Sequence, residues 1–348
     1  MGEIVSPAIA RLQALGEQVA PSRAERRQPR APGHRRSALA APHLCSGSLR
    51  EIAAQVPHFE RQPVSGIAGR AHAGPPHLDV ILRRAGPEVG LIDVPVAMVP
   101  RHSRSQSHAR VIAALDRALV AVRANPGETH ARLALEEFGA SMALALDLPR
   151  AFEFDPGDGH GLGLRLTCFN TVTGSGPRLM LSWHRAASDA SIAVGITRLE
   201  YRVSHRTPVA PGELIPSVQE AVARSRAEAG TLAAWREQLV TRARLAHWTD
   251  GAVRRTWGPR AAARIFHIAM TGWDAEPAFG FERVAPSRRT MRTTRQVPAA
   301  PRFAETVFDA LLTAAWVASQ EHDWQERADR VAEVTLLMRA LLRPERGQ

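Results

Sequence analysis

The chain contains no lysine. All 45 of its Lys-plus-Arg positions are arginine, against 34 acidic residues, which gives a formal net charge of +11 over 348 residues. Asparagine occurs only at Asn125 and Asn170, and tyrosine only at Tyr201. A bias of this kind is typical of GC-rich coding sequences, so part of the charge reflects composition rather than function. The remaining excess keeps nucleic acid among the expected partners, with acidic proteins as an alternative.

Cysteine is also scarce. Cys45 and Cys168 stand far apart, in no metal-binding or disulfide-framework spacing, so a reducing, cytoplasmic location is expected. No run approaches the ~18 apolar residues that cross a bilayer, and no signal peptide is predicted, so we expect no membrane association. Hydrophobic residues make up 45% of the chain, which is enough for a sizeable core.

Two basic segments flank the expected core domain, residues 51–282. Residues 1–50 carry six arginines between positions 23 and 36, interleaved with prolines that break helices, so we expect a tail that is disordered. A basic arm that binds phosphates is the alternative for this tail. Residues 283–302 hold six arginines and no acidic residue, which predicts a basic linker. A C-terminal helical pair is predicted at 303–348, with an apolar stripe that begins at Phe303 and Val307.

The middle of the chain favours an antiparallel sheet. Apolar residues alternate over 164–168, 179–183 and 192–196, the pattern of half-buried strands. After Thr197 the apolar parity changes, so a bulge or a new strand is needed there. A strand at an edge is predicted over 91–99. Residues 130–148 are compatible with either helix or strand.

Helical spacing surrounds this region. A helix is predicted from Ser105 or Ser107 to the Asn-Pro-Gly stop at 125–127. From Pro211 onward an apolar stripe runs through Val218, Val222, Ala229 and Leu232 to Trp235 and Leu239. The predicted fold class is α+β, with a central antiparallel sheet, flanking helices and a helical C-terminal part.

Several segments together resemble a known family, in the family's order. The segment at 155–175 holds a Gly-Asp turn followed by Asn170, Thr171, Val172, Thr173, Gly174 and Ser175, and the segment at 181–185 holds a Trp-x-Arg triplet. The others are VPVAMVPRHSRSQSHARVIAALDRAL (94–119), GASMALALDLP (139–149), YRVSHRTPV (201–209) and the closing stretch 306–342.

This set is similar to the domain of unknown function 932 family, which comprises phage/plasmid-like proteins of bacterial mobile elements. The resemblance covers residues 94–342 and implies a mobile-element context, in which DNA processing is the expected role. Thr173 replaces the acidic position of the family's Asn-Ser-x-Asp-Gly-Ser motif, and residues 188–191 replace its Cys-x-Asn-Gly. An activity carried by those positions in relatives would be altered here. The matching motif residues are Asn170, Thr171, Gly174, Ser175 and Trp183.

Other constellations favour structure over chemistry. Asn170, at a strand end, is expected to form a turn and bond its own main chain. His184, Ser188 and Asp189 have no nucleophile elbow around them, so no catalytic residue is predicted. His102, His108 and His130 miss the spacing of a helical metal pair, and the glycine-rich stretch 155–163 lacks the acids of a calcium loop. That stretch is expected to form a tight hairpin turn. We predict neither metal nor cofactor.

The leading hypothesis is a non-enzymatic nucleic-acid-binding protein that uses an arginine-rich sheet face to bind DNA rather than RNA. An aromatic content of 5% gives little support to base stacking. Two alternatives stay open: an enzyme acting on nucleic acid or nucleotides through Asp155, Asp158 or His184, and a structural or host-interaction protein that depends on its tail. A homo-oligomer is compatible with each. The predicted phosphate contacts are Arg178, Arg185, Arg198, Arg202, His205 and Arg206.

Overall fold

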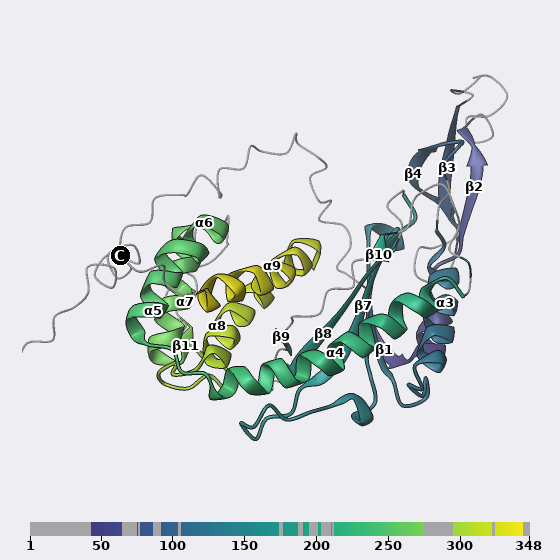
Figure 1. The fold of residues 1–348 in the computed structure, drawn as a ribbon. Helices are drawn as coiled ribbons and strands as arrows, with labels where there is room; N and C mark the ends of the chain where they lie inside the picture. The colour runs from purple at the N-terminus through teal and green to yellow at the C-terminus, as the bar shows by residue number, and fades with distance from the viewer. Residues whose placement is uncertain are drawn as a thin grey trace, which may run out of the picture.

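A mixed α+β fold is found in the computed structural model, as the sequence predicts. An antiparallel main sheet stands between a small sheet and a helical C-terminal block (Figure 1). No helix among the described residues is long and apolar enough to cross a membrane. The structure describes residues 43–64, 75, 77–85, 92–103, 106–173, 177–186, 191–194, 201–202, 210, 212–274, 295–321 and 324–343.

The main sheet has the strand order β1-β5-β6-β7-β8-β10, and β9 also pairs with β8. Its first strand corrects the predicted tail boundary, because residues 43–48 pair with β5 and so belong to the fold; residues 1–42 lie outside the described residues. The strands are β1 (His43–Ser48), β5 (His130–Glu136), β6 (Ser141–Asp147), β7 (Gly163–Thr171), β8 (Arg178–Ala186), β9 (Ser191–Val194) and β10 (Tyr201–Arg202).

Residues 130–148 form strands rather than helix. In β5 and β6 the buried residues alternate with more exposed ones, and Leu133 pairs with Leu144 across the two strands. The connection turns at Gly139, whose φ of +84° lies in the left-handed region. A Cβ there would lie 2.6 Å from Pro57, so glycine meets both a conformational and a steric need.

The predicted change of parity after Thr197 is also present. Trp183 pairs with Val194 in β9, whereas Leu179 pairs with Tyr201 in β10. Measured against β8, the register of β10 is shifted by three residues from the register of β9. Because side chains alternate between faces with a period of two, an odd shift exchanges the faces, as the sequence required.

We call the two sides of the main sheet the inner face and the outer face. The inner face carries Leu133, Leu144, Cys168 and Leu179 in one row across four strands, each at most 2% exposed. Four helices bury their apolar sides against it, and α4 crosses the sheet in Figure 1. They are α2 (Leu49–Ala53), α3 (His108–Ala121), α4 (Leu214–Glu237) and α8 (Val307–Ser319).

The helix ends agree closely with the sequence. Ser107 is the N-cap of α3 and accepts from the Arg110 amide, and the helix stops just before the Asn-Pro-Gly turn. In α4 the predicted stripe is buried at Val218, Val222, Leu232 and Trp235 and partly buried at Ala229, and Ser225 bonds the Ala221 carbonyl. Leu239 is the exception: it follows the helix end and is 76% exposed, which corrects its predicted place on the stripe.

The small sheet comprises β2 (Phe59–Pro63), β3 (Leu78–Arg83) and β4 (Val94–Pro100), with β3 in the middle. The predicted edge strand at 91–99 corresponds to β4. Pro95 is tolerated there because an edge strand leaves one side of its backbone unpaired. A register shift between Ile81 and Leu82 accommodates it.

The C-terminal block is helical. Residues 295–302 lie in the predicted linker but belong to this fold, because Arg295 and Gln296 form a strand and Val297 is buried; residues 283–294 lie outside the described residues. The closing helical pair is α8 and α9, although Phe303, predicted on its apolar stripe, is 54% exposed. The block comprises α5 (Arg242–Trp248), a π-helical turn (Thr249–Val253), α6 (Arg254–Trp257), α7 (Pro259–Thr271), β11 (Trp273–Asp274), β12 (Arg295–Gln296), α8 and α9 (Trp324–Leu342).

Candidate functional site

Five of the residues predicted to form a site have described side chains. Arg178, Arg185, Trp183, Asn170 and Thr171 can be placed, and they do not share one surface. For Arg202 the structure describes only its backbone place in β10. The other predicted site residues lie outside the described residues: Gly174, Ser175, Arg198, His205 and Arg206.

Arg185 lies on the inner face of β8, which corrects its predicted place on a phosphate-binding surface. Its side chain is 2% exposed, and Nη2 donates to the Asp158 carboxylate at 2.6 Å. The ring of Phe308 lies 5.4 Å from the guanidinium carbon. Among the described residues, its Nε and Nη1 have no hydrogen-bond partner. A charge held in the core in this way cannot follow a phosphate backbone.

Trp183 lies on the same inner face, two residues before Arg185. It is 3% exposed and meets Phe154 edge to face, with ring centroids 4.6 Å apart. Its indole nitrogen also has no partner in the part of the chain that the structure describes. Two segments that carry the family resemblance therefore meet here, because Asp158 comes from the first and Trp183 and Arg185 from the second. These contacts lie in the core and present no surface for binding.

Asn170 is not a turn residue. It is 1% exposed on the inner face, where its Nδ2 donates to Nδ1 of His108 at 2.7 Å and to the Gln106 carbonyl at 3.0 Å. Nε2 of His108 then donates to the Gly139 carbonyl at 2.8 Å, so both imidazole nitrogens are occupied. Sequence reasoning missed this pair because 62 residues separate its members. The local turn forms instead at Thr171, whose hydroxyl accepts from the Thr173 amide.

The catalytic alternative requires Asp155, Asp158 and His184 to converge, and they do not. His184 projects from the outer face of β8, whereas Asp158 contacts Arg185 on the inner face. Arg165 donates to Nδ1 of His184, so the neutral imidazole carries its proton on Nε2 and donates to the Ser182 hydroxyl. This tautomer cannot accept the hydroxyl proton, so His184 is not placed as a general base for Ser182.

A polar row crosses the outer face over four strands. The cross-strand pairs place His130, Asp147, Arg165 and Ser182 side by side. Arg132 comes from the neighbouring row, and we count it as part of the polar row because it contacts Asp147. Asp147 accepts from Arg132 at 3.1 Å and also from Arg165. Exposure falls across the row: the Arg132 side chain is 44% exposed, that of Arg165 is 13% exposed, and Ser182 is buried. Solvent reaches this row from the β5 side.

Positive charge exceeds negative charge in this row, since Arg132 and Arg165 share one carboxylate. Burial lowers the pKa of Arg165, and the nearby Arg132 lowers it further, while Asp147 opposes both effects. Burial also lowers the pKa of His184 well below its ordinary range, with Arg165 and Arg132 acting in the same direction. The part of each shift that comes from the neighbouring arginines is the part that an anion beside the row would offset.

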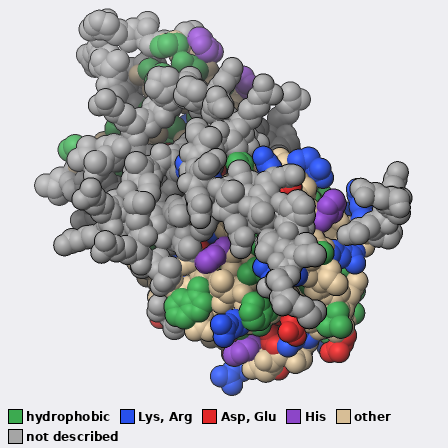
Figure 2. Space-filling model, turned by 90° about the vertical axis from the view of Figure 1, so that its left-hand side faces the viewer, with side chains coloured by type: hydrophobic (Ala, Val, Ile, Leu, Met, Phe, Trp, Pro, Cys, Tyr) green, Lys and Arg blue, Asp and Glu red, His purple; other side chains and the backbone are tan. Residues whose placement is uncertain are grey.

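Arg178 is on the outer face but is not free. It donates to Asp329 of α9 at 2.6 Å, and its side chain is 21% exposed. On the face shown in Figure 2, basic, acidic and hydrophobic side chains are interspersed over the described part. On that face, charge alone does not locate an interface.

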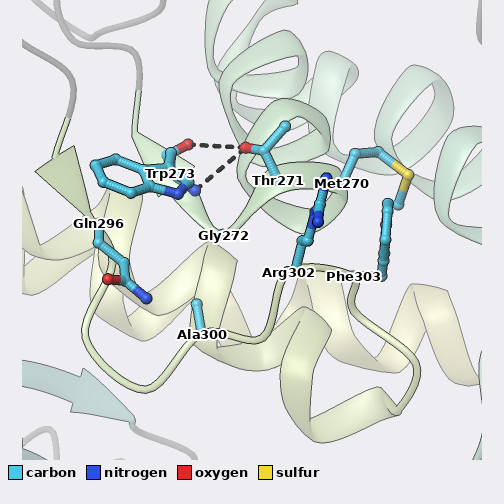
Figure 3. Close-up of a pocket in the computed structure, with 8 residues that line it drawn as sticks. All are labelled: Met270, Thr271, Gly272, Trp273, Gln296, Ala300, Arg302 and Phe303. Atoms are coloured by element: carbon cyan, nitrogen blue, oxygen red, sulfur yellow. Dashed lines mark hydrogen bonds between the residues drawn. The ribbon is translucent and has the colours of Figure 1, made fainter.

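A separate cavity of about 680 Å³ lies beside the β11–β12 hairpin (Figure 3). Trp273 and Gln296 line one end, and Met270, Arg302 and Phe303 line the other. The Thr271 hydroxyl bonds the backbone of Trp273 and fixes the turn between α7 and β11. Of these residues only Arg302 and Phe303 carry a signal that sequence reasoning used, Arg302 as part of the basic linker and Phe303 as the start of the last apolar stripe.

The hairpin is anchored by a buried ion pair. Arg264 donates to both oxygens of Asp274 at 2.8 and 2.6 Å, and the indole nitrogen of Trp316 donates to the same carboxylate at 2.7 Å. Arg295 stacks on the Trp316 ring at 4.5 Å. Since Asp274 follows Trp273 directly, this network holds one wall of the cavity.

Comparison with known proteins gives no match: no protein-family model, no curated protein and no solved structure aligns with the chain. The resemblance to the domain of unknown function 932 family therefore stays a prediction. Among the described residues no group of three or more His, Cys, Asp and Glu side chains could hold a metal ion.

Proposed function

We propose that the protein binds nucleic acid, DNA in the first instance, through the β5 side of the outer face and without catalysing a reaction. The observation that carries the proposal is the row in which Arg132 and Arg165 share Asp147. The proposed contact is still a sheet face that bears arginines. Its residues differ from those that the sequence indicated, because Arg185 faces the core.

The chemistry suits phosphate. A guanidinium presents several N–H donors in a plane and keeps its charge at any physiological pH, and arginine is the common choice for phosphate contacts. Arg132 uses only Nη2 in its contact with Asp147, and nearly half of its side chain is exposed. The neighbouring outer-face positions are small, Ala143, Ala145 and Thr167, so a sugar-phosphate backbone can approach the strands closely.

The wider setting belongs to the same proposal. A phage or plasmid origin follows only from the family resemblance, and a cytoplasmic location follows only from the cysteine usage. The basic segment at 23–36 would add phosphate contacts, but it lies outside the described residues. A structural or host-interaction role depends on that segment.

Fluorescence anisotropy with labelled single-stranded and duplex DNA tests the proposal. We expect binding at micromolar protein that weakens steeply between 50 and 200 mM salt, because phosphate contacts release counterions. Arg132→Ala should weaken binding about fivefold and reduce the salt slope by about one.

Arg117→Ala is the matched control, since Arg117 is an exposed arginine of α3, a helix on the inner side of the sheet. It should leave affinity nearly unchanged. The absence of salt-sensitive binding, or equal effects of the two substitutions, would overturn the proposal.

A further inference from the structure

Two aromatic rings are exposed at the cavity beside the β11–β12 hairpin. Trp273 is 47% exposed and Phe303 is 54% exposed, although large aromatic side chains are normally buried. Figure 3 shows them at opposite ends of the cavity. Exposed aromatic rings that line a hollow mark a binding surface more often than a defect of packing.

Polar groups stand beside both rings. The Gln296 side chain, whose amide both donates and accepts, lies at the Trp273 end (Figure 3). The Arg302 guanidinium lies 5.8 Å from the centroid of the Phe303 ring, and within the described part of the chain it forms no ion pair. Its charge is therefore available to an anionic ligand.

The walls of the cavity are fixed before any ligand binds. Gly272 has a φ of +73°, and a Cβ there would lie 2.9 Å from the Pro301 carbonyl oxygen, so the two chain segments approach as closely as glycine allows. The Ala304 amide also donates to the Ala269 carbonyl at 2.7 Å. Together with the Arg264–Asp274 ion pair, these contacts fix the backbone at Trp273 and Phe303. A fixed backbone lowers the entropic cost of binding.

A ligand for this cavity needs flat apolar faces, a polar edge and a nearby negative charge. A nucleotide meets all three conditions: the base can stack on an indole or phenyl ring, its edge can bond an amide, and its phosphate can meet an arginine. The volume of about 680 Å³ lies within the usual range of small-ligand pockets. A base inside a duplex is stacked on both faces and paired along its edge, so it cannot enter the site.

We propose that this cavity binds an unpaired base of single-stranded nucleic acid, with the base stacked on Trp273 or Phe303 and the adjoining phosphate on Arg302. This inference rests on the proposed nucleic-acid binding and narrows it, because the outer face would supply charge contacts and the cavity would supply the preference for single strands.

Two oligonucleotides of equal length separate the contributions. One is a labelled oligo-dT, and the other carries the same phosphates with abasic positions throughout. We expect the full-length protein to bind oligo-dT roughly tenfold more tightly, which is the worth of about one stacked base. Trp273→Ala and Phe303→Ala should reduce that ratio toward one, and Trp273→Phe should retain part of it. Arg132→Ala should weaken binding to both probes and leave the ratio unchanged.

Phe138→Ala is the matched control, since Phe138 is an exposed ring, 42% accessible, between β5 and β6. It should leave the ratio as in the wild type, and melting temperatures should confirm that every variant is folded. Equal affinity of the wild-type protein for the two probes would overturn this inference while leaving the proposed function intact. Failure to bind either probe would overturn both.

Discussion

The two faces of the main sheet use the same pair of residue types in opposite ways. On the inner face Arg185 and Asp158 form an ion pair whose side chains are 2% and 11% exposed. On the outer face Arg132 and Arg165 share Asp147, and solvent reaches the Arg132 side chain. Strand β8 contributes to both, because Trp183 and Arg185 point inward while Ser182 and His184 point outward.

Burial decides what such a pair does. In the core, an ion pair offsets the cost of removing two charges from water only while both partners are present, so it locks an arrangement without adding much stability. At the surface a similar pair is worth little to folding, about 1 kcal/mol or less, and its arginine stays available to other anions. The inner pair is therefore structural, and the outer row is a candidate interface.

The largest effect should come from the inner face. Asp158→Asn leaves the buried Arg185 without its hydrogen-bonded counter-ion, and within the described part of the chain its Nε and Nη1 have no partner. We expect a loss of about 3–5 kcal/mol in the free energy of unfolding, measured by urea denaturation. Asp155→Asn is the control in the same loop: Asp155 acts on Arg185 as a neighbouring charge, and an Asn oxygen can still accept from the Gly157 amide, so the loss should be clearly smaller. Equal losses for the two variants would contradict a special role for the buried pair.

Acid should also act on the inner face, through His108. Burial lowers the pKa of His108 to about 4, although its hydrogen bond to Gly139 acts in the opposite direction. In the unfolded chain the ordinary value of 6.5 applies, so between pH 6.5 and 4 the unfolded state binds a proton that the folded state refuses. The contribution of His108 to stability is full above pH 6.5 and is lost as the pH falls toward 4, by on the order of 3 kcal/mol.

Denaturation curves for the wild type and His108→Gln at pH 7 and pH 4.5 measure this effect. The variant should be less stable at pH 7, because Asn170 and Gly139 lose their partner, and it should lose less on acidification. His184 contributes to the acid loss with the same sign in both proteins. If wild type and variant lose equal stability on acidification, His108 is not the group responsible.

Much of the sheet could be predicted from sequence, because its alternation is local. The strands of the middle region, the change of parity after Thr197 and the helix that begins after Ser107 all follow from spacing within a few residues. Residues 130–148 stayed ambiguous because alanine and leucine suit both states. Their pairing with β1 and β7, far away in sequence, decides for strand.

The site could not be predicted in the same way. An arginine on an alternating strand looks the same whether it faces helices or solvent, so Arg185 was placed on the wrong face. Its partner Asp158 lies 27 residues earlier, and Asn170 meets His108 across 62 residues. Trp273 gave no signal, and Phe303 was expected on the apolar stripe of a helix. Neither exposure could be predicted, because exposure of an aromatic residue depends on the packing of α7, α8 and the hairpin.

The outer face should respond to the matching substitution chiefly with a change in binding. Asp147→Asn removes the carboxylate that Arg132 and Arg165 share, in a row that solvent reaches. We expect a smaller loss of stability than for Asp158→Asn, because Asp147 is 34% exposed, although Arg165 is only 13% exposed. DNA binding should be stronger by about twofold to fivefold, since two cations then face the phosphates unopposed. Anisotropy at 50 mM salt measures the gain, and weaker binding would contradict an interface on this face.

The smallest effect tests a position between the two environments. Glu228 is half-buried on α4, the helix that covers the inner face, and burial raises its pKa to about 7 while Arg224 acts to lower it. Its ordinary pKa is 4.5, so above pH 7 the folded protein holds a carboxylate that the unfolded chain solvates better. The folded state is therefore penalised progressively as the pH rises from 4.5 through 7.

Glu228→Gln removes the charge at little cost to helix propensity. Because nearby solvent screens the group, we expect a gain of less than about 1 kcal/mol at pH 8 and almost none at pH 5. Thermal melts at the two pH values measure the difference, and an equal gain at both would mean that packing, not ionisation, limits this helix.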